Sequence, residues 1–271
     1  MRTDTDRSQR KQCFLRYFQR VPNCGDRFAT FLADHYFPCW TDSVQDEQLD
    51  NPNLILIGSI LSWADARSLV GGAGLIHPQI PLAATPAYIT FLRGPLTARA
   101  LESRGIDVPN RFADSGILAP RLFPRRIEPR YPVGIVPHYV DQDSDWVSRW
   151  SDQGIRVLDV GAPLDEFMLD IQSCELILSS SLHGIVFAHA FGRPALWIEL
   201  SDCVLGDGFK FYDYYTSLGI EPADVPRVRI HEAELPSDLA RFASLPNTSD
   251  LSDSAEEGMI LLADELSRWI T

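Results

Sequence analysis

Cysteine is scarce in this sequence, and no two cysteines stand at a metal-binding spacing. The 271-residue chain has five cysteines and no C-x-x-C element. A disulfide framework needs an even set of cysteines, and structural zinc sites use closely spaced pairs. The scarcity therefore argues against both and predicts the reduced thiols of a cytoplasmic protein. The five are Cys13, Cys24, Cys39, Cys174 and Cys203.

Long apolar runs are also missing. No run reaches the roughly 18 to 20 residues that a membrane-spanning helix needs. The first residues, MRTDTDRSQRKQ, lack the apolar stretch of a secretory signal peptide. Both absences again predict a cytoplasmic location.

Basic residues are fewer than acidic ones. The chain has 24 Lys and Arg and 37 Asp and Glu, which give a formal net charge of -13. We expect no nucleic-acid partner, since so acidic a protein repels phosphate backbones. Two segments are locally basic and are either solvated or in peripheral contact with the anionic inner face of the cell membrane. They are residues 1–20, with six basic and two acidic residues, and the stretch that contains Arg121, Arg125, Arg126 and Arg130.

What the sequence does have is an alternation of apolar runs and helical patterns. Most of the runs are continuous, as expected for parallel strands covered on both faces. The alternation predicts an α/β fold with parallel sheets. The predicted strands are Leu54–Ile57, Tyr88–Leu92, Val133–Pro137, Val157–Val160, Leu176–Leu178 and Ala195–Leu200, and the predicted helices are Gly25–Tyr36, Pro95–Arg104, Asp145–Gln153, Leu164–Ser173, His183–Phe191 and Ser252–Trp269.

The alternation is interrupted once, between Ala119 and Pro132. This segment reads APRLFPRRIEPRYP and its four prolines predict a linker. We therefore expect an N-terminal Rossmann-like domain over residues 1–120 and a C-terminal one over residues 121–250. A last helix, within residues 251–271, is expected to pack back on the N-terminal domain. The two domains would face a cleft at the carboxyl ends of their strands, where open α/β sheets bind ligands.

Three serines and a histidine stand where the predicted strand Leu176–Leu178 leads into a helix. The segment reads LILSSSLHGIVFAHAFGRP. One serine is enough to cap a helix, whereas several hydroxyls beside the free N–H groups of the first turn suit an anion. Gly184 would let the backbone approach a ligand closely. We therefore expect Ser180, Ser181 and Gly184 to bind an anionic group.

His183, at the start of this helix, has two interpretations. It is either a capping or packing side chain, or a proton donor or acceptor beside the anion. His189 lies about 120° further round the helix, so the two cannot form an i,i+4 metal pair, and His189 is expected in the core. A serine hydrolase is disfavoured because the sequence has no G-x-S-x-G elbow.

With these residues in view, the chain resembles the polysaccharide pyruvyltransferase family. It is most similar to the ketal-forming enzymes of exopolysaccharide synthesis, of which the xanthan and succinoglycan enzymes are examples. The resemblance rests on the order and spacing of segments that span most of the chain. They are NCGDRFATFL (Asn23–Leu32), NLILIGSIL (Asn53–Leu61), GGAGLI (Gly71–Ile76), FLRGPLTARALESRGI (Phe91–Ile106), FADSGILAPRLFP (Phe112–Pro124), VGIVPHYVD (Val133–Asp141), SSSLHGIVFAHAFGRP (Ser179–Pro194) and GDGFKFYDYYTSLG (Gly206–Gly219).

The sequence departs from the family pattern in two places. Many members have an arginine immediately before Leu-His-Gly, where this chain has Ser181. If that arginine holds the donor in those members, another cation must do so here. Many members also carry a longer glycine run where this chain has Gly58-Ser59.

The resemblance implies a glycosyltransferase-B-like fold, in which two Rossmann-like domains face a cleft. It also implies phosphoenolpyruvate as the donor and a lipid-linked oligosaccharide of an exopolysaccharide repeat unit as the acceptor. The pyruvyl group would bridge two hydroxyls of one sugar, and phosphate would be released. This chemistry requires no metal and no organic cofactor.

Such a reaction needs cations for the donor and groups that transfer protons. Arg93, at the end of a predicted strand, and Lys210, between glycines and aromatic residues, are expected to bind the donor, although each could instead be structural or solvated. His183 and His138 are expected to be catalytic. We favour His183 as the acid, because a bound phosphate would raise its pKa, but the reverse assignment stays open.

The acceptor side has weaker signals. Asn23, Gly25 and Asp26 stand at a loop-to-helix turn and are expected to contact the sugar, although Asp26 could simply cap the helix. The tyrosines of the FKFYDYY segment could stack on a sugar or pack in the core. They are Tyr212, Tyr214 and Tyr215.

Two other functions fit the same residues. One is a glycosyltransferase that uses a nucleotide sugar on the same fold. The other is a non-catalytic sugar-binding subunit of a polysaccharide assembly complex. The sequence leaves the acceptor sugar, the bridged pair of hydroxyls and the oligomeric state open.

Overall fold

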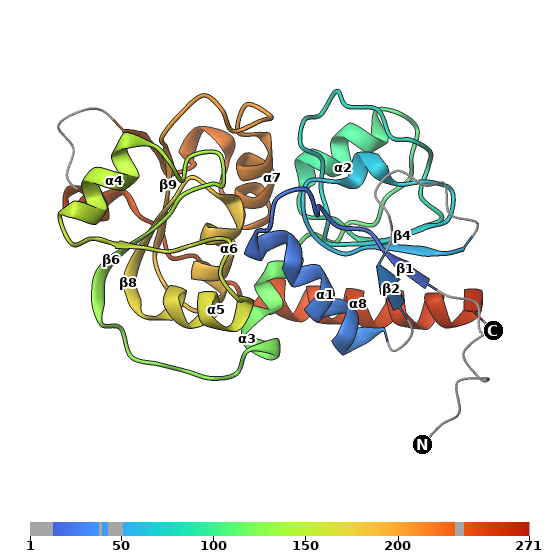
Figure 1. Ribbon diagram of the computed structural model, residues 1–271. Helices are drawn as coiled ribbons and strands as arrows, with labels where there is room; N and C mark the ends of the chain where they lie inside the picture. Colours follow the sequence, from blue (N-terminus) through green and yellow to red (C-terminus); the bar gives the residue numbers. More distant parts are fainter. Residues whose placement is uncertain (1–12, 38–39, 43–50, 231–235, 271) are drawn as a thin grey trace, which may run out of the picture.

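Two parallel five-stranded sheets, one from each half of the chain, form the framework of the protein (Figure 1). The computed structural model describes residues 13–37, 40–42, 51–230 and 236–270. The first sheet contains β1 (Cys13–Leu15), β2 (Trp40–Asp42), β3 (Asn53–Ile55), β4 (Ser68–Gly71) and β5 (Tyr88–Phe91), and the second contains β6 (Tyr131–Val136), β7 (Arg156–Val157), β8 (Cys174–Ser179), β9 (Ala195–Glu199) and β10 (Arg227–Arg229).

The two sheets have the same strand order. The first runs β2-β1-β3-β4-β5 and the second, read from its other edge, runs β7-β6-β8-β9-β10. Each half therefore has a doubly wound, Rossmann-like arrangement whose direction of winding reverses beside its first strand. The reversal points lie between β1 and β3 and between β6 and β8, and ligands bind at the carboxyl ends of strands at such points. The expected α/β class with two Rossmann-like halves is confirmed.

Helices cover both sheets and the space between them. The α-helices are α1 (Cys24–Tyr36), α2 (Pro95–Glu102), α3 (Ala119–Leu122), α4 (Asp145–Asp152), α5 (Leu164–Gln172), α6 (Leu182–Ala190), α7 (Phe209–Ser217) and α8 (Ser249–Ile270). Short 3-10 helices lie at η2 (Leu61–Trp63), η3 (Ser115–Leu118), η4 (Pro222–Asp224) and η5 (Pro236–Phe242).

Several elements escape the sequence patterns. Strands β1, β2, β4 and β10 lie outside the predicted strands, and the expected strand Val157–Val160 begins and ends earlier, as β7. Helix α7 has aromatic residues on most of its surface rather than on one face, so its sequence lacks the helical period.

Helix α6 lies at the centre of the molecule. Its sequence LHGIVFAHA is apolar on nearly every side, and seven of its nine residues are buried. A helix of this kind must be covered all round. It packs on β8 and β9 of its own sheet and against α1, α5 and η3, so residues of both halves surround it.

Helices α1 and α8 cross from one half to the other. Helix α1 follows β1 of the first sheet, yet it also packs on α5 and α6 of the second half. Helix α8 follows the second half and runs beneath the first, where it lies against β4, β5 and η3 (Figure 1). The buried residues of α8 lie on one face of the helix and include Ala255, Met259, Leu262 and Leu266. These two helices hold the two halves together.

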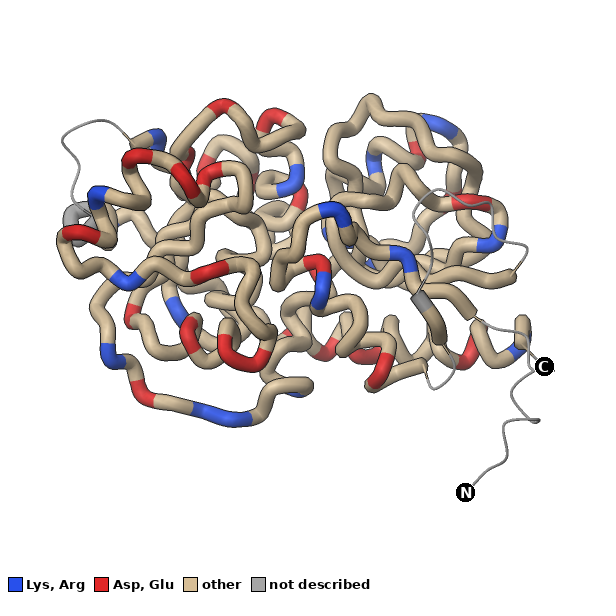
Figure 2. The backbone as a smooth tube through the Cα atoms, in the orientation of Figure 1, with Lys and Arg blue, Asp and Glu red and all other residues tan. Residues whose placement is uncertain are grey.

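Basic residues of the expected linker lie on the outside of the second half. The segment between α3 and β6 runs around its lower edge in Figure 2 and includes Arg125, Arg126 and Arg130, all exposed. Arg121, in α3, pairs with Asp253 of α8 at 2.7 Å. Arg2, Arg7, Arg10 and Lys11 of the basic N-terminal stretch, and Cys39, lie outside the described residues. Within those residues, no helix is both long and apolar enough to cross a membrane.

Candidate functional site

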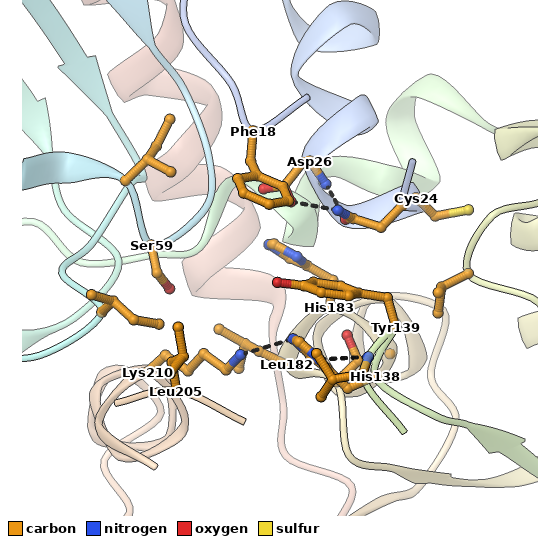
Figure 3. A pocket seen from close by; sticks show the side chains of 18 of the residues that line it. Phe18, Cys24, Asp26, Ser59, His138, Tyr139, Leu182, His183, Leu205 and Lys210 are labelled. Atoms are coloured by element: carbon orange, nitrogen blue, oxygen red, sulfur yellow. Dashed lines mark hydrogen bonds between the residues drawn. The ribbon is translucent and has the colours of Figure 1, made fainter. Parts of the chain in front are cut away.

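A cavity of about 510 Å³ opens between the two halves, at the reversal points of both sheets (Figure 3). Its walls come from segments that follow β1, β3, β6 and β8 and from the start of α7. The polar lining includes Asn23, Asp26, Ser59, His138, Ser181, His183 and Lys210, and the glycines Gly25 and Gly184 contribute backbone. Eight of the predicted site residues therefore share one cavity, although they come from four distant segments.

The three serines that precede α6 have different partners. Ser179 donates its hydroxyl to the carbonyls of Val136, at 2.9 Å, and Ser181, at 2.7 Å. Ser180 accepts from the backbone N–H of His138 at 2.8 Å and donates to the carboxylate of Asp141 at 2.7 Å. These two serines fix the end of β8 to the end of β6. Of the three, only Ser181 lines the cavity, so the structure places Ser180 behind the wall.

The N-terminus of α6 opens onto the cavity. Ser181 is the N-cap residue and its side chain makes no capping hydrogen bond. Leu182, His183 and Gly184, the first three residues of the helix, all line the cavity. Their N–H groups have no partner within the helix, and the helix dipole favours an anion at this point. This end of the cavity is therefore suited to a phosphate or carboxylate group.

Lys210 and His138 form a pair on one wall (Figure 3). Lys210 Nζ lies 3.5 Å from His138 Nε2. Burial, and then the charge of Arg93, lowers the pKa of Lys210 to about 8. Burial, and then the charge of Lys210, lowers the pKa of His138 to about 3. At neutral pH the pair therefore consists of a protonated lysine and a neutral histidine.

His183 lies against the N-terminal half. A Cβ placed on Gly25 would stand 1.9 Å from His183 Nδ1, so the helix α1 backbone and the imidazole are in direct contact only because residue 25 is glycine. The ring stacks on Phe187 at 5.8 Å. Burial, and then the charge of Lys210, lowers the pKa of His183 to about 3. In this site both candidate catalytic histidines are therefore neutral.

Asn23, the N-cap of α1, and Asp26, in its first turn, both line the cavity. The amide of Asn23 donates to Asp26 Oδ2 at 2.6 Å, and its Oδ1 accepts from the Asp26 N–H at 2.9 Å. Burial raises the pKa of Asp26 to about 6. Helix capping is the role of Asn23, which leaves the carboxyl of Asp26 free to contact a ligand.

The family of the chain follows from comparison with known proteins. The model of the polysaccharide pyruvyl transferase family matches residues 82–202, a segment that contains His138 and His183. Succinoglycan biosynthesis protein ExoV of Rhizobium meliloti is 26% identical over 210 residues, which cover 75% of this chain and 65% of ExoV. The chain belongs to the polysaccharide pyruvyl transferase family. Membership identifies it as a transferase, and the resemblance seen in the sequence motifs is confirmed.

Two further comparisons give no information about activity. An uncharacterised protein of Acanthamoeba polyphaga mimivirus is 33% identical over 225 residues, which cover 79% of this chain and 77% of that protein. The solved structure of the wall teichoic acid polymerase TagF covers 94% of this chain and 83% of its own, with 10% identity and a TM-score of 0.41. A likeness at that level carries no argument about activity.

Arg93, which the sequence also predicts to bind the donor, does not line the cavity. Its guanidinium is fully buried and donates to Asp213 at 2.9 Å, to Ser59 at 2.7 Å and to the carbonyl of Leu75 at 2.6 Å. Among the described lining residues, Lys210 is the only lysine or arginine. Lys210 therefore places a cation at the cavity wall, and Arg93 lies behind Ser59, to which its guanidinium donates.

Several residues at or near the site have no role predicted from the sequence. The rings of Phe18 and Tyr139 come from different halves and stack at 6.1 Å beside the cavity. Asp114, fully buried, approaches His183 from η3. Tyr214 and Tyr215 are buried in the core, and Tyr212 packs on Trp197, so none of these tyrosines lines the cavity. Within the described residues, no three His, Cys, Asp or Glu side chains gather as a metal site.

Proposed function

We propose that this chain transfers the pyruvyl group of phosphoenolpyruvate to two hydroxyls of one sugar in a lipid-linked exopolysaccharide repeat unit, with release of phosphate. One observation carries the proposal. A helix N-terminus, a protonated lysine and two neutral histidines line a single cavity at both reversal points of the fold. These are the groups that the reaction uses, and every step can be written with them alone.

The donor carries three negative charges and belongs at the end of the cavity formed by α6 and Lys210. The free N–H groups of the first turn, the hydroxyl of Ser181 and the ammonium of Lys210 would contact its phosphate and carboxylate. Arg93 is not a contact in this proposal. Its buried charge acts on the site at short range, as its effect on the pKa of Lys210 indicates.

Proton delivery to the donor is assigned to Lys210 and His138. The ammonium of Lys210, with a pKa of about 8, delivers its proton to the methylene carbon of phosphoenolpyruvate, and His138, whose Nε2 lies 3.5 Å from Nζ and whose Nδ1 accepts from the Val140 N–H at 3.4 Å, positions it. That carbon becomes a methyl group, and positive character develops at the carbon that bears the phosphate. A positioned acid of this kind typically contributes roughly 10²- to 10⁴-fold to the rate.

Proton removal from the acceptor is assigned to His183. Its ring is neutral and contacts Gly25, next to Asn23 and Asp26, which would hold the sugar. His183 takes the proton of the first hydroxyl as its oxygen bonds to the activated carbon, and the second hydroxyl closes the ketal as the phosphate leaves. Of the two hydroxyl protons, one replaces the proton given to the methyl group and the other departs with the phosphate. This assignment is the reverse of the one favoured from sequence.

A lipid-linked acceptor would bring the protein to the inner face of the cell membrane. The exposed basic residues between α3 and β6 are suited to a peripheral contact with anionic lipid. The proposal needs no metal and no organic cofactor, because proton transfer and charge stabilisation are the only demands of the reaction.

The test is an incubation of the protein with phosphoenolpyruvate and lipid-linked oligosaccharides. We expect phosphate release that depends on the acceptor, and a pyruvate ketal on the sugar by mass spectrometry. His183→Ala should keep its fold by circular dichroism and lose at least roughly 10² in turnover. Phosphoenolpyruvate should also raise the melting temperature more than nucleotide sugars do.

Two results would overturn the proposal. One is stabilisation by a nucleotide sugar and not by phosphoenolpyruvate, which would favour a glycosyltransferase. The other is a folded His183→Ala protein with near-normal turnover, which would remove the assigned base.

A further inference from the structure

Two buried polar atoms face each other across the two halves without a hydrogen bond. Asp114 Oδ2, in the N-terminal half, lies 3.9 Å from His183 Nε2, in the C-terminal half. Among the described residues, neither atom has a hydrogen-bond partner. The Asp114 side chain is fully buried, and 13% of the His183 side chain is exposed although its Nε2 is not. The accessible part of the imidazole therefore faces the cavity, and its Nε2 faces the carboxyl.

The position of each group is fixed by its own element. Asp114 is the N-cap of η3, where its Oδ1 accepts from the Gly116 N–H at 2.9 Å. Helix α6 packs directly on η3, because a Cβ on Gly116 would already lie 2.9 Å from Val186. His183 is held between Phe187 and Gly25. The second oxygen of Asp114 is thus aimed at the imidazole by the packing of the two halves.

An arrangement of this kind is costly unless the two groups interact. A buried polar atom without a partner typically costs about 1 to 3 kcal/mol. A hydrogen bond between an N–H and a carboxylate oxygen needs a separation near 2.9 Å, so an approach of about 1 Å would satisfy both atoms. Hydrogen bonds in catalytic sites are often long before substrate binds and shorten in the complex.

We propose that Asp114 is a positioning residue for His183, holding its Nε2 as the protonated nitrogen and leaving the Nδ1 lone pair to take the acceptor's proton. This inference rests on the proposed function for the role of His183, but the pairing itself does not. The carboxylate of Asp114 also stabilises the imidazolium that forms when Nδ1 is protonated. Because one partner comes from each half, the base is oriented only when the halves are packed as they are here.

Charged neighbours of both groups are compatible with this role. Burial, and then the charges of Lys210 and Arg93, lower the pKa of His183 and so keep it neutral until substrate binds. Burial raises the pKa of Asp114 to about 6, and the Gly116 N–H and Arg93 lower it again, while Asp213 and Asp26 raise it further. At neutral pH Asp114 is therefore mainly ionised and able to accept from Nε2.

Asp114→Asn tests the pairing, because asparagine keeps the size of the side chain and the oxygen that caps η3. Its amide N–H would face Nε2 and make that nitrogen an acceptor, which moves the ring proton to Nδ1. Nitrogen NMR of isotope-labelled histidine, with His183 assigned through a His183→Gln variant, should show Nε2–H in the wild type and Nδ1–H in Asp114→Asn. Turnover should fall on the order of 10²-fold or more, with a much smaller change in KM for phosphoenolpyruvate.

Asp65→Asn is the matched control. Asp65 is another largely buried carboxylate of the N-terminal half, bonded to Asn53, Ser68 and Arg16 and outside the cavity. Loss of the Asp65 carboxylate should lower the melting temperature and leave the His183 tautomer and turnover unchanged. A wild-type His183 already protonated at Nδ1, or a tautomer that does not respond to Asp114→Asn, would overturn the inference. The NMR signal needs no substrate. If phosphoenolpyruvate is not the donor, the tautomer result therefore still holds, and only the turnover assay fails.

Discussion

At the scale of single residues, the proposed donor site depends on the charge of Lys210. It is the only lysine or arginine among the described residues that line the cavity, and it lies on α7, whereas the arginine of many family members precedes Leu-His-Gly, where this chain has Ser181. A lysine can lose its charge in a buried site, whereas an arginine stays protonated. The exchange of one cation for the other therefore makes donor binding sensitive to pH.

We expect KM for phosphoenolpyruvate to rise above about pH 8. Burial lowers the pKa of Lys210 to about 8, so its ammonium is lost as the pH rises through that value. If only the protonated form binds the donor, KM should rise about tenfold per pH unit beyond the pKa. Steady-state kinetics between about pH 7 and about pH 9.5 measure the effect.

Lys210→Arg separates this cause from a general effect of alkaline pH. A guanidinium stays charged throughout the range, so KM in this variant should stay nearly constant even if turnover falls. A rise in KM of the same size in both proteins would show that another group titrates.

How far the site can be predicted depends on where each residue's partners are. His138, His183 and Lys210 were predictable because each follows a recognisable strand end or motif. Arg93 looked equivalent from sequence, but its partner Asp213 is 120 residues further along the chain and shows no local pattern. Asp114 lies in a segment that carries the family resemblance, but its position opposite His183 depends on the packing of the other half and could not be predicted.

At the scale of elements, α7 is joined to the N-terminal half through Asp213. This carboxylate accepts from Arg93 Nε at 2.9 Å and from the N–H and hydroxyl of Thr97, at 2.8 and 2.7 Å, and it is fully buried. Thr97 lies in the first turn of α2. The contact fixes the start of α7, and with it Lys210, against the end of β5.

Asp213→Asn should therefore destabilise the protein strongly. Removing one partner of a buried ion pair typically costs about 3 to 5 kcal/mol, because the other charge stays buried and unpaired. We expect a loss of about 3 kcal/mol in the free energy of unfolding by urea at neutral pH. Asp170→Asn is the control, since Asp170 pairs with the half-exposed Arg156 and should cost about 1 kcal/mol or less. Equal losses in the two variants would contradict the role given to the Asp213 pair.

The elements themselves were predictable where the sequence has a continuous apolar run or a helical pattern. Continuous apolar runs marked β3, β5, β6, β8 and β9, and a helical period marked every helix of eight or more residues except α7. The shorter strands β1, β2 and β10 depend on pairing with a neighbour rather than on their own composition. The common strand order of the halves, which places the cavity, has no signal in the sequence at all.

At the scale of the whole molecule, placing titratable groups between the halves links stability to pH. Burial lowers the pKa of three histidines, His138 and His183 to about 3 and His189 to about 4. Burial also raises the pKa of two carboxyls, Asp26 and Asp114, to about 6. Four of these five groups belong to the cavity or its wall, so the site and the fold titrate together.

The histidines and carboxyls act in opposite directions as the pH falls below neutrality. Unfolded histidines bind protons below about pH 6.5 that the folded ones do not, so their contribution to stability is lost as the pH falls. Folded Asp26 and Asp114 bind protons near pH 6 that the unfolded chain binds only near pH 4, so they regain part of that loss. The stability lost through the three histidines exceeds the stability regained through the two carboxyls. We therefore expect the free energy of unfolding to be about 3 kcal/mol lower at pH 5 than at pH 7. Urea unfolding at the two pH values measures this, and His183→Gln should reduce the difference by about 2 kcal/mol. Stability that is equal at both values, or greater at pH 5, would mean that the histidines are not held neutral in the folded protein.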